Sequence, residues 1–183
     1  LAYDQVGKHD LALNAYEHAQ SLGFLTPYVL FNGGNACRSL GRSDEAIRLY
    51  HEALLLFPGF AEAHHNLSHA YCDVGDLNAA ERQLRLLLRD QPECYAAAFS
   101  LGNLLRDRKC CSEAIEAYRL CLEYAPAYPD AWNNLGLLYS GLKQFKSALA
   151  CYHHALSIDS CFKPARQNLA QGLVQEKRHV DAL

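Results

Sequence analysis

Three side chains of the kinds that bind zinc lie close together in the middle of the sequence. His65, His69 and Cys72 stand at positions i, i+4 and i+7, so on an α-helix they share one face, and the histidine pair can reach one metal ion. A single helix rarely supplies three ligands, however, and the sequence shows no second group of ligands. We therefore expect no metal and no cofactor. The sequence also lacks a phosphate-binding loop and a nucleophile elbow, which favours a chain that is not an enzyme.

A column of asparagines offers a different chemistry. Asn32, Asn66, Asn134 and Asn168 are separated by 34, 68 and 34 residues, and Ser100 occupies the missing position. Each side-chain amide carries donors and an acceptor, so a regular row of them could hold the main chain of an extended peptide with little regard to its sequence. The same amides could instead only join neighbouring helices. The sequence leaves both interpretations open.

The 34-residue spacing of the asparagines extends to other residue types. One column is small and another is mostly aromatic. The small column contains Ala12, Ala46, Ala80, Ala114, Ala148 and Ala182, and the aromatic column contains Tyr16, Tyr50, Leu84, Tyr118 and Tyr152. Prolines follow at Pro58, Pro92 and Pro126, where each would end a helix. A fixed period of 34 residues is typical of a helix–turn–helix repeat, in which each unit contacts only its neighbours.

One unit of this pattern contains Trp132, Leu135, Gly136, Tyr139, Ala148, Tyr152 and Ala155. The combination resembles the tetratricopeptide repeat, and the resemblance covers essentially the whole chain. It implies an all-α fold, a right-handed superhelical α-solenoid of antiparallel helix pairs. We expect one array over residues 1–183, with partial repeats over 1–26 and 163–183 and full repeats over 27–60, 61–94, 95–128 and 129–162.

The two ends of the sequence interrupt a repeat, and the chain does not begin with Met. We interpret it as an excerpt of a longer array. Because terminal repeats normally carry a polar outer face, we expect the uncapped ends to self-associate or to fray near residue 183.

The resemblance also implies that the first helix of each repeat lines a concave groove that binds a partner. Besides the asparagine column, three columns of side chains would face this groove. The expected partner-binding residues in them are Phe31, His65, Phe99 and Asn133, then Asn35, His69 and Asn103, and finally Arg38 and Arg106. These aromatic and arginine side chains would add preference to a grip on the peptide main chain.

A long series of 34-residue units with an inner asparagine column is also similar to the arm of the O-linked N-acetylglucosamine transferase family. That similarity implies a non-catalytic module that recruits protein substrates to a glycosyltransferase domain. The alternative is a scaffold subunit of a multiprotein complex, which would bind one partner through a patch around Tyr28, Phe31 and Phe99.

The carboxylate clamp of heat-shock cochaperones is a further alternative. Such a clamp grips a C-terminal carboxylate with lysine and arginine side chains, and two asparagines assist them. Phe31 and Phe99 stand where the first lysine should be, so the cationic grip is absent and we disfavour this function.

The composition limits the remaining classes of partner. The formal net charge of -3 gives no footprint for nucleic acid or an anionic membrane surface, and no apolar run approaches the roughly 20 residues that span a bilayer. We expect protein or extended peptide partners, and neither nucleic acid nor membrane. The eight cysteines form no disulfide-like pattern, which favours the cytoplasm or the nucleus. The sequon Asn66-Leu67-Ser68 falls within a predicted helix, and we interpret it as a chance occurrence.

Overall fold

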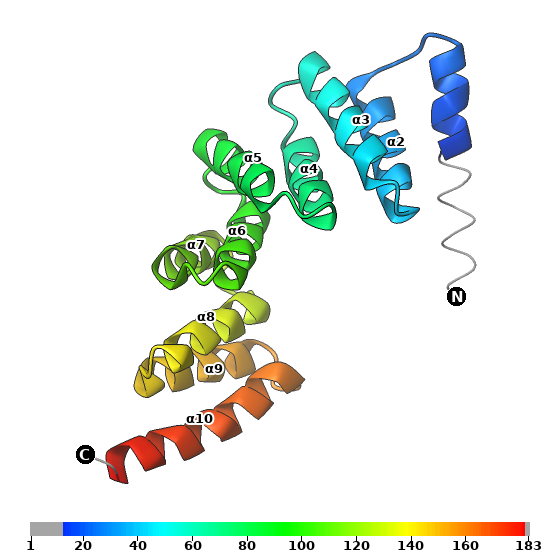
Figure 1. Ribbon diagram of the computed structural model, residues 1–183. Coiled ribbons are helices and arrows are strands. Elements are labelled where there is room, and N and C mark those ends of the chain that lie inside the picture. Colours follow the sequence, from blue (N-terminus) through cyan, green and yellow to red (C-terminus); the bar gives the residue numbers. More distant parts are fainter. Residues whose placement is uncertain (1–12, 182–183) are drawn as a thin grey trace. The chain divides into compact units, whose positions relative to one another are not determined.

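The structure is a computed structural model that describes residues 13–181, and the surroundings of side chains as far as Lys177. Every regular element in this part of the chain is a helix (Figure 1). The all-α class expected from the repeats is therefore confirmed. Ala12 and Ala182 of the small column lie outside the described residues, as does the end of the chain at residue 183.

The helices begin where the repeats were expected to begin. After a helical segment over residues 13–21, the first helices of successive repeats are α2 (Pro27–Ser39), α4 (Ala61–Asp73), α6 (Tyr95–Asp107), α8 (Pro129–Gly141) and α10 (Lys163–Asp181). The second helices are α3 (Ser43–Leu56), α5 (Leu77–Asp90), α7 (Cys111–Tyr124) and α9 (Phe145–Ile158). The first residue of each first helix is also the first residue of a predicted repeat.

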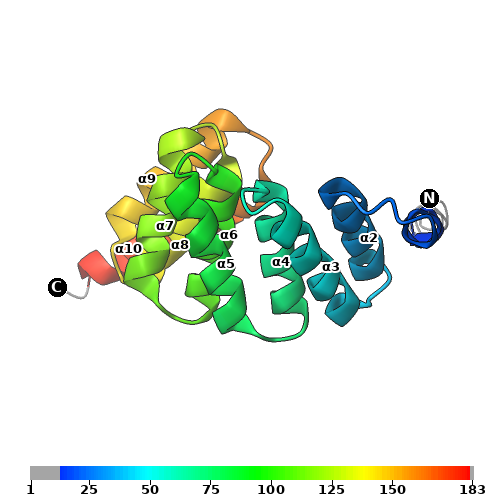
Figure 2. The ribbon, with the colours of Figure 1, turned by 90° about the horizontal axis from the view of Figure 1, so that it is seen from above.

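The chain divides into two compact units, one ending at Pro92 and the other beginning at Glu93. In the first unit α2 packs on α3, α3 on α4 and α4 on α5, and Figure 2 shows α2, α3 and α4 following one another. In the second unit α6 packs on α7, α7 on α8, and both α8 and α10 pack on α9. Among the described helices, none has the length and apolar character that crossing a membrane would require.

The turn inside each helix pair requires one residue in the left-handed region of backbone space. Gly41 (φ 77°) and Gly75 (φ 83°) occupy this position in the first unit, and Lys109 (φ 61°) and Lys143 (φ 59°) occupy it in the second. The four residues follow the same 34-residue spacing as the asparagines. Glycine adopts this conformation freely, whereas a residue with a Cβ loses about 1–2 kcal/mol. The turns of the second unit therefore hold some backbone strain.

A glycine lets the two helices of a pair approach closely in three of the repeats. A Cβ built on Gly34 would lie only 2.6 Å from the Tyr50 ring, sixteen residues later, and that ring is fully buried. In the repeat over 61–94 the partners are instead Ser68 and Leu84, which are also buried. The repeat with a residue larger than glycine on its first helix thus has a residue smaller than tyrosine on its second helix. The two equivalent pairs of the second unit are Gly102 with Tyr118, at 2.6 Å, and Gly136 with Tyr152, at 2.5 Å.

The small column and two of the cysteines form part of the core. Ala46, Ala80, Ala114 and Ala148 are completely buried, which allows the helices of each pair to lie side by side. Cys37 and Cys121 are also completely buried, and all eight cysteines are free thiols. Burial raises the pKa of the Cys121 thiol to about 11, so this cysteine packs as a small apolar side chain.

Candidate functional site

The first unit contains a cluster of amide and aromatic side chains that joins three helices. We call Phe31, Asn35, Tyr50, Phe60 and Asn66 the first amide–aromatic cluster. The Tyr50 hydroxyl on α3 and the Asn66 Nδ2 group on α4 both donate to the Asn35 Oδ1 atom on α2, each at 2.7 Å. One carbonyl oxygen with two lone pairs therefore holds the three helices together.

Aromatic rings extend this cluster beside the amides. The Phe31 ring centroid lies 5.9 Å from that of Tyr50 and 4.9 Å from that of Phe60, in tilted arrangements that aromatic pairs favour. Tyr28 and Phe57 also contact Phe60, at 5.1 Å and 5.6 Å. Phe31 is half-buried and Tyr28 is 61% exposed, so an apolar surface continues outward from the amide group.

The second unit repeats the cluster 68 residues later. The second amide–aromatic cluster consists of Phe99, Asn103, Tyr118, Tyr128 and Asn134. The Tyr118 hydroxyl and Asn134 Nδ2 donate to Asn103 Oδ1 at 2.7 and 3.0 Å. The Phe99 ring lies 5.9 Å from Tyr118 and 4.8 Å from Tyr128. The two units therefore present the same constellation, with tyrosine in place of Phe60.

The tyrosine hydroxyls act as permanent donors in both clusters. Burial raises the pKa of Tyr50 and of Tyr118 to about 12, and the loss of hydration is the largest cause in each case. Both phenols therefore stay protonated at any physiological pH. A neutral phenol gives its hydrogen to the asparagine oxygen and holds the amide plane in one orientation.

The asparagine column joins neighbouring helices. Asn168 also joins two helices, because its Nδ2 group donates to Asn133 Oδ1 at 2.9 Å, but this acceptor lies 35 residues earlier and not 31 as for Asn66 and Asn134. Asn133 is nearly buried, with 5% exposure, and itself contacts Asn134 at 3.4 Å. An amide nitrogen carries two hydrogens and each of these bonds uses one. The Asn66 and Asn134 amides also interact with the Tyr50 and Tyr118 hydroxyls, so a peptide carbonyl that binds them would compete with these contacts.

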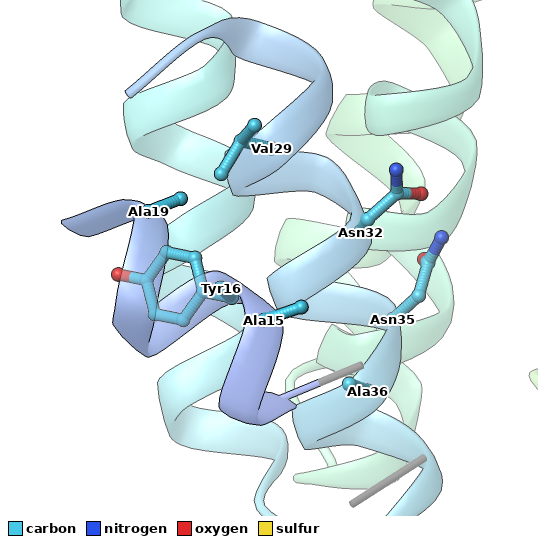
Figure 3. A pocket seen from close by; sticks show the side chains of 7 residues that line it. All are labelled: Ala15, Tyr16, Ala19, Val29, Asn32, Asn35 and Ala36. Carbon is cyan, nitrogen blue, oxygen red and sulfur yellow. The ribbon is translucent and has the colours of Figure 1, made fainter. Parts of the chain in front are cut away.

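Asn32 lies at the other end of the column, at the rim of a cavity of about 410 Å³. Figure 3 shows Asn32 and Asn35 on neighbouring turns of α2, with Ala15 and Tyr16 contributed by the helical segment over residues 13–21. The cavity is lined mainly by small and apolar side chains, and the two amides are its polar groups. This combination suits an uncharged ligand.

The four expected groove residues that carry ionisable side chains are engaged with other side chains. Arg38 Nε donates to Asp73 Oδ2 at 2.6 Å, and Arg106 pairs with the neighbouring Asp107 at 2.9 Å. Two further side chains, His65 and His69, contact each other. Each arginine is thus held by a carboxylate, and hydrogen bonding and apolar contact are the main chemistry that the rest of this surface offers.

Two groups of residues carry roles that column-by-column reading of the sequence did not assign. One is the pair of tyrosine hydroxyls, at 50 and 118, which the sequence places only in an aromatic column. The other is the pair of rings at 60 and 128, just before α4 and α8. A period of 68 residues relates both pairs and is the signal that could have found them. The expected scaffold patch is divided: Tyr28 and Phe31 contact Phe60 in the first unit, and Phe99 lies in the second.

A second cavity, of about 470 Å³, lies between α7, α8 and α9. The Trp132 ring stacks on His154 at 4.5 Å, and Arg119 donates to the Tyr139 hydroxyl at 2.6 Å. From the sequence, Trp132 is expected only as part of the repeat pattern. This cavity adds to the second unit a recess with one cation, hydrogen-bonded to Tyr139, and one carboxylate, Glu123.

Comparison with known families supports the repeat pattern. Models of the tetratricopeptide repeat match residues 38–104 and residues 129–160. Among solved structures, the crystal structure of MamA protein superposes with a TM-score of 0.76 at 25% identity, covering 85% of each chain. A structure described as YrrB, a TPR protein with an unusual peptide-binding site, superposes with a TM-score of 0.73 at 20% identity, covering 90% of this chain and 84% of that one.

Two curated relatives belong to different classes of protein. The human Protein O-mannosyl-transferase TMTC1 is 33% identical over 180 residues, which is 96% of this chain and 20% of the relative. The bovine BBSome complex member BBS4 is 26% identical over 115 residues, which is 63% of this chain and 22% of the relative. The chain thus spans about a fifth of the length of each.

Proposed function

Because the chain belongs to the tetratricopeptide repeat family, whose fold is a protein-interaction module, we propose that it binds extended polypeptide segments and recruits them as substrates of a protein O-glycosyltransferase. The single observation that carries this proposal is the duplicated amide–aromatic cluster. Each cluster offers main-chain hydrogen bonding through half-buried amides beside an aromatic surface. The similarity to a protein O-mannosyl-transferase over 96% of the chain supports the recruiting role.

The chemistry of the clusters favours recognition of uncharged segments. Arg38 is held by Asp73 and Arg106 by Asp107, so neither guanidinium is a strong partner for an acidic peptide. An extended main chain presents N–H and C=O groups at regular intervals, which asparagine amides can match. The aromatic rings would contact the peptide side chains that alternate with these groups. We further propose that this chain binds and does not catalyse, because the clusters contain no nucleophile next to a base.

The experiment compares the 183-residue chain with a variant in which Asn66 and Asn134 are both alanine. The control variant changes Asn14 and Asn78, two exposed asparagines outside the clusters. Fluorescence anisotropy with labelled, uncharged peptides rich in serine and threonine measures binding, and circular dichroism measures helicity. We expect the cluster variant to lose most of its affinity, the control to retain it, and both to remain helical. Equal binding by both variants would contradict the proposal.

A scaffold function is the second candidate, and the similarity to a BBSome complex member favours it. A scaffold would bind one partner through a defined surface, such as the exposed rings of Tyr28 and Phe57, which pack on the buried Phe60 in the first unit. Affinity purification from cells distinguishes the two functions. A single partner that survives the asparagine substitutions and is lost in Tyr28→Ala supports the scaffold, whereas many weak partners lost with the asparagines support recruitment.

We also propose that the protein works in a reducing compartment and that it self-associates. The expectation of a reducing compartment rests on the free cysteines, and it predicts that the sequon at Asn66 stays unmodified in cells. The folded state supports this, because Asn66 Nδ2 is bonded to Asn35 and Ser68 is buried. Glycan found on Asn66 by mass spectrometry of the cellular protein would overturn the assignment. The predicted self-association is tested by light scattering of the same protein.

A further inference from the structure

Two histidine rings on adjacent turns of α4 form a contact that the repeat fold does not require. The Nε2 atoms of His65 and His69 lie 3.3 Å apart, and the ring centroids are separated by 4.6 Å with the planes at 81°. The equivalent positions of the other full repeats hold Phe31 with Asn35, Phe99 with Asn103, and Asn133 with Leu137. Among the full repeats, the pair of imidazoles is therefore particular to this helix.

The separation of the two nitrogens matches that of two ligands on one zinc ion. A tetrahedral zinc ion with Zn–N bonds of about 2.0–2.1 Å holds two ligand nitrogens about 3.3–3.4 Å apart. Histidines at i and i+4 project from one helix face, so both Nε2 atoms face a common point without a change in the helix, and a metal ion would replace the hydrogen that they share in this structure. We propose that His65 and His69 bind a zinc ion, or a similar divalent transition metal, through their Nε2 atoms.

The site is open, because the protein supplies only two ligands. Among the residues that the structure describes, no group of three or more histidine, cysteine or acidic side chains is arranged to hold a metal ion. The argument against three ligands from one helix therefore does not apply. The remaining coordination positions are filled by water or by a side chain of a bound partner. Imidazole ligands suit zinc, copper and nickel, and they exclude the hard cations magnesium and calcium.

The surroundings of the pair favour the neutral form of His69. Burial is the largest influence on His69 and lowers its pKa, and the nearby Arg38 lowers the pKa further while Asp73 raises it. These influences favour the neutral form of His69, which is the form that binds metals. The charge that Arg38 contributes from α2 is balanced by Asp73 at the C-terminal end of α4, through their ion pair. This ion pair reduces the positive charge that a dication meets at the two histidines.

Zinc titration of the purified 183-residue chain tests the proposal. Calorimetry measures binding of Zn²⁺ alone, with Mg²⁺ as the hard-cation control, and ¹⁵N chemical shifts of the imidazoles identify the ligands. The test variants are His65→Gln and His69→Gln, since an amide keeps polarity and length. The control variant carries His18→Gln and His153→Gln, which removes two exposed imidazoles from other helices.

We expect one zinc ion per chain in the parent protein and in the control. Each test variant should lose more than about tenfold in zinc affinity. A loss of roughly tenfold is what removal of an outer-shell partner costs a metal site, and loss of a direct ligand should cost more. Binding should also weaken as the pH falls, because protons compete with the metal ion for the imidazoles. Zinc binding that is unchanged in both test variants, or that falls equally in the control, would overturn the proposal, and so would a parent chain that binds no zinc. Circular dichroism of the variants separates loss of a ligand from loss of fold.

Discussion

Replacing Gly102 with alanine tests whether glycine determines how closely the two helices of a repeat approach. The new Cβ would lie 2.6 Å from Cε1 and 2.7 Å from Cδ1 of Tyr118, inside the distance that carbon atoms tolerate. The ring has little room to retreat, because it is fully buried and its hydroxyl is held by Asn103 at 2.7 Å. The substitution therefore forces the two helices apart or displaces the ring.

Two effects of opposite sign determine how much the free energy of unfolding changes in the Gly102→Ala variant. Alanine is better than glycine in a helix interior by about 1 kcal/mol, whereas overpacking of a close-packed core costs about 1–3 kcal/mol. Because the ring of Tyr118 is fixed at both ends, we place the steric cost at the upper end of that range. The free energy of unfolding should fall by about 1–2 kcal/mol in the Gly102→Ala variant.

Urea denaturation followed by circular dichroism measures this change, and two further variants control it. Gly141→Ala adds a Cβ with no atom within 4 Å, so it should not destabilise the protein. In a Tyr118→Leu background, which copies the natural pair of Ser68 and Leu84, Gly102→Ala should be neutral or stabilising. A Gly102→Ala variant as stable as the parent would refute the steric argument, and so would an equal loss in the leucine background.

Four further predictions concern the turns, the clusters and the thiols. Lys143→Gly should raise the free energy of unfolding by up to about 1 kcal/mol, because the left-handed turn residue would no longer carry a side chain; a loss of stability in urea would contradict this. Asn103→Ala should cost about 1–3 kcal/mol, since a buried phenol and an amide lose their shared acceptor, and the same denaturation assay measures it. Burial raises the pKa of Tyr118 from 10.0 to about 12, so its neutral phenol contributes stability that is complete below pH 10 and is lost as the pH rises through 12. Ultraviolet titration of the folded protein measures this pKa. Ionisation of this tyrosine near pH 10 would disprove the prediction. A maleimide should label exposed Cys161 quickly and leave buried Cys121 unmodified until urea unfolds the protein.

The helices and their order follow from the sequence because a repeat imposes the same constraints at the same spacing. Helix starts such as Ala61 and Tyr95 coincide with the first residues of predicted repeats, since the periodic small and apolar residues locate the helix faces. The buried alanine column also follows, because close helix packing requires small side chains. Local sequence therefore determines most of this fold.

The partners within the candidate site depend on distances that a column of equivalent residues does not contain. A column relates residues 34 apart, but Asn66 bonds to Asn35, 31 residues before it, and Arg38 bonds to Asp73, 35 residues after it. These partners come from neighbouring columns, so their pairing depends on the angle between two helices. Whether an asparagine faces a ligand or another asparagine is decided by that angle.

The packing contact between Gly34 and Tyr50 and the hydrogen bond between Asn35 and Asn66 have different consequences for how such a gene can be rearranged. The contact between Gly34 and Tyr50 lies inside one repeat, so recombination at a repeat boundary preserves it. The bond between Asn35 and Asn66 crosses that boundary, and exchange of a single repeat would separate its donor from its acceptor. A block of two repeats, such as residues 27–94 or 95–162, contains both the packing contact and the hydrogen bond. Duplication of such blocks would lengthen the array without loss of any cluster, whereas insertion of one repeat would leave an amide without its partner.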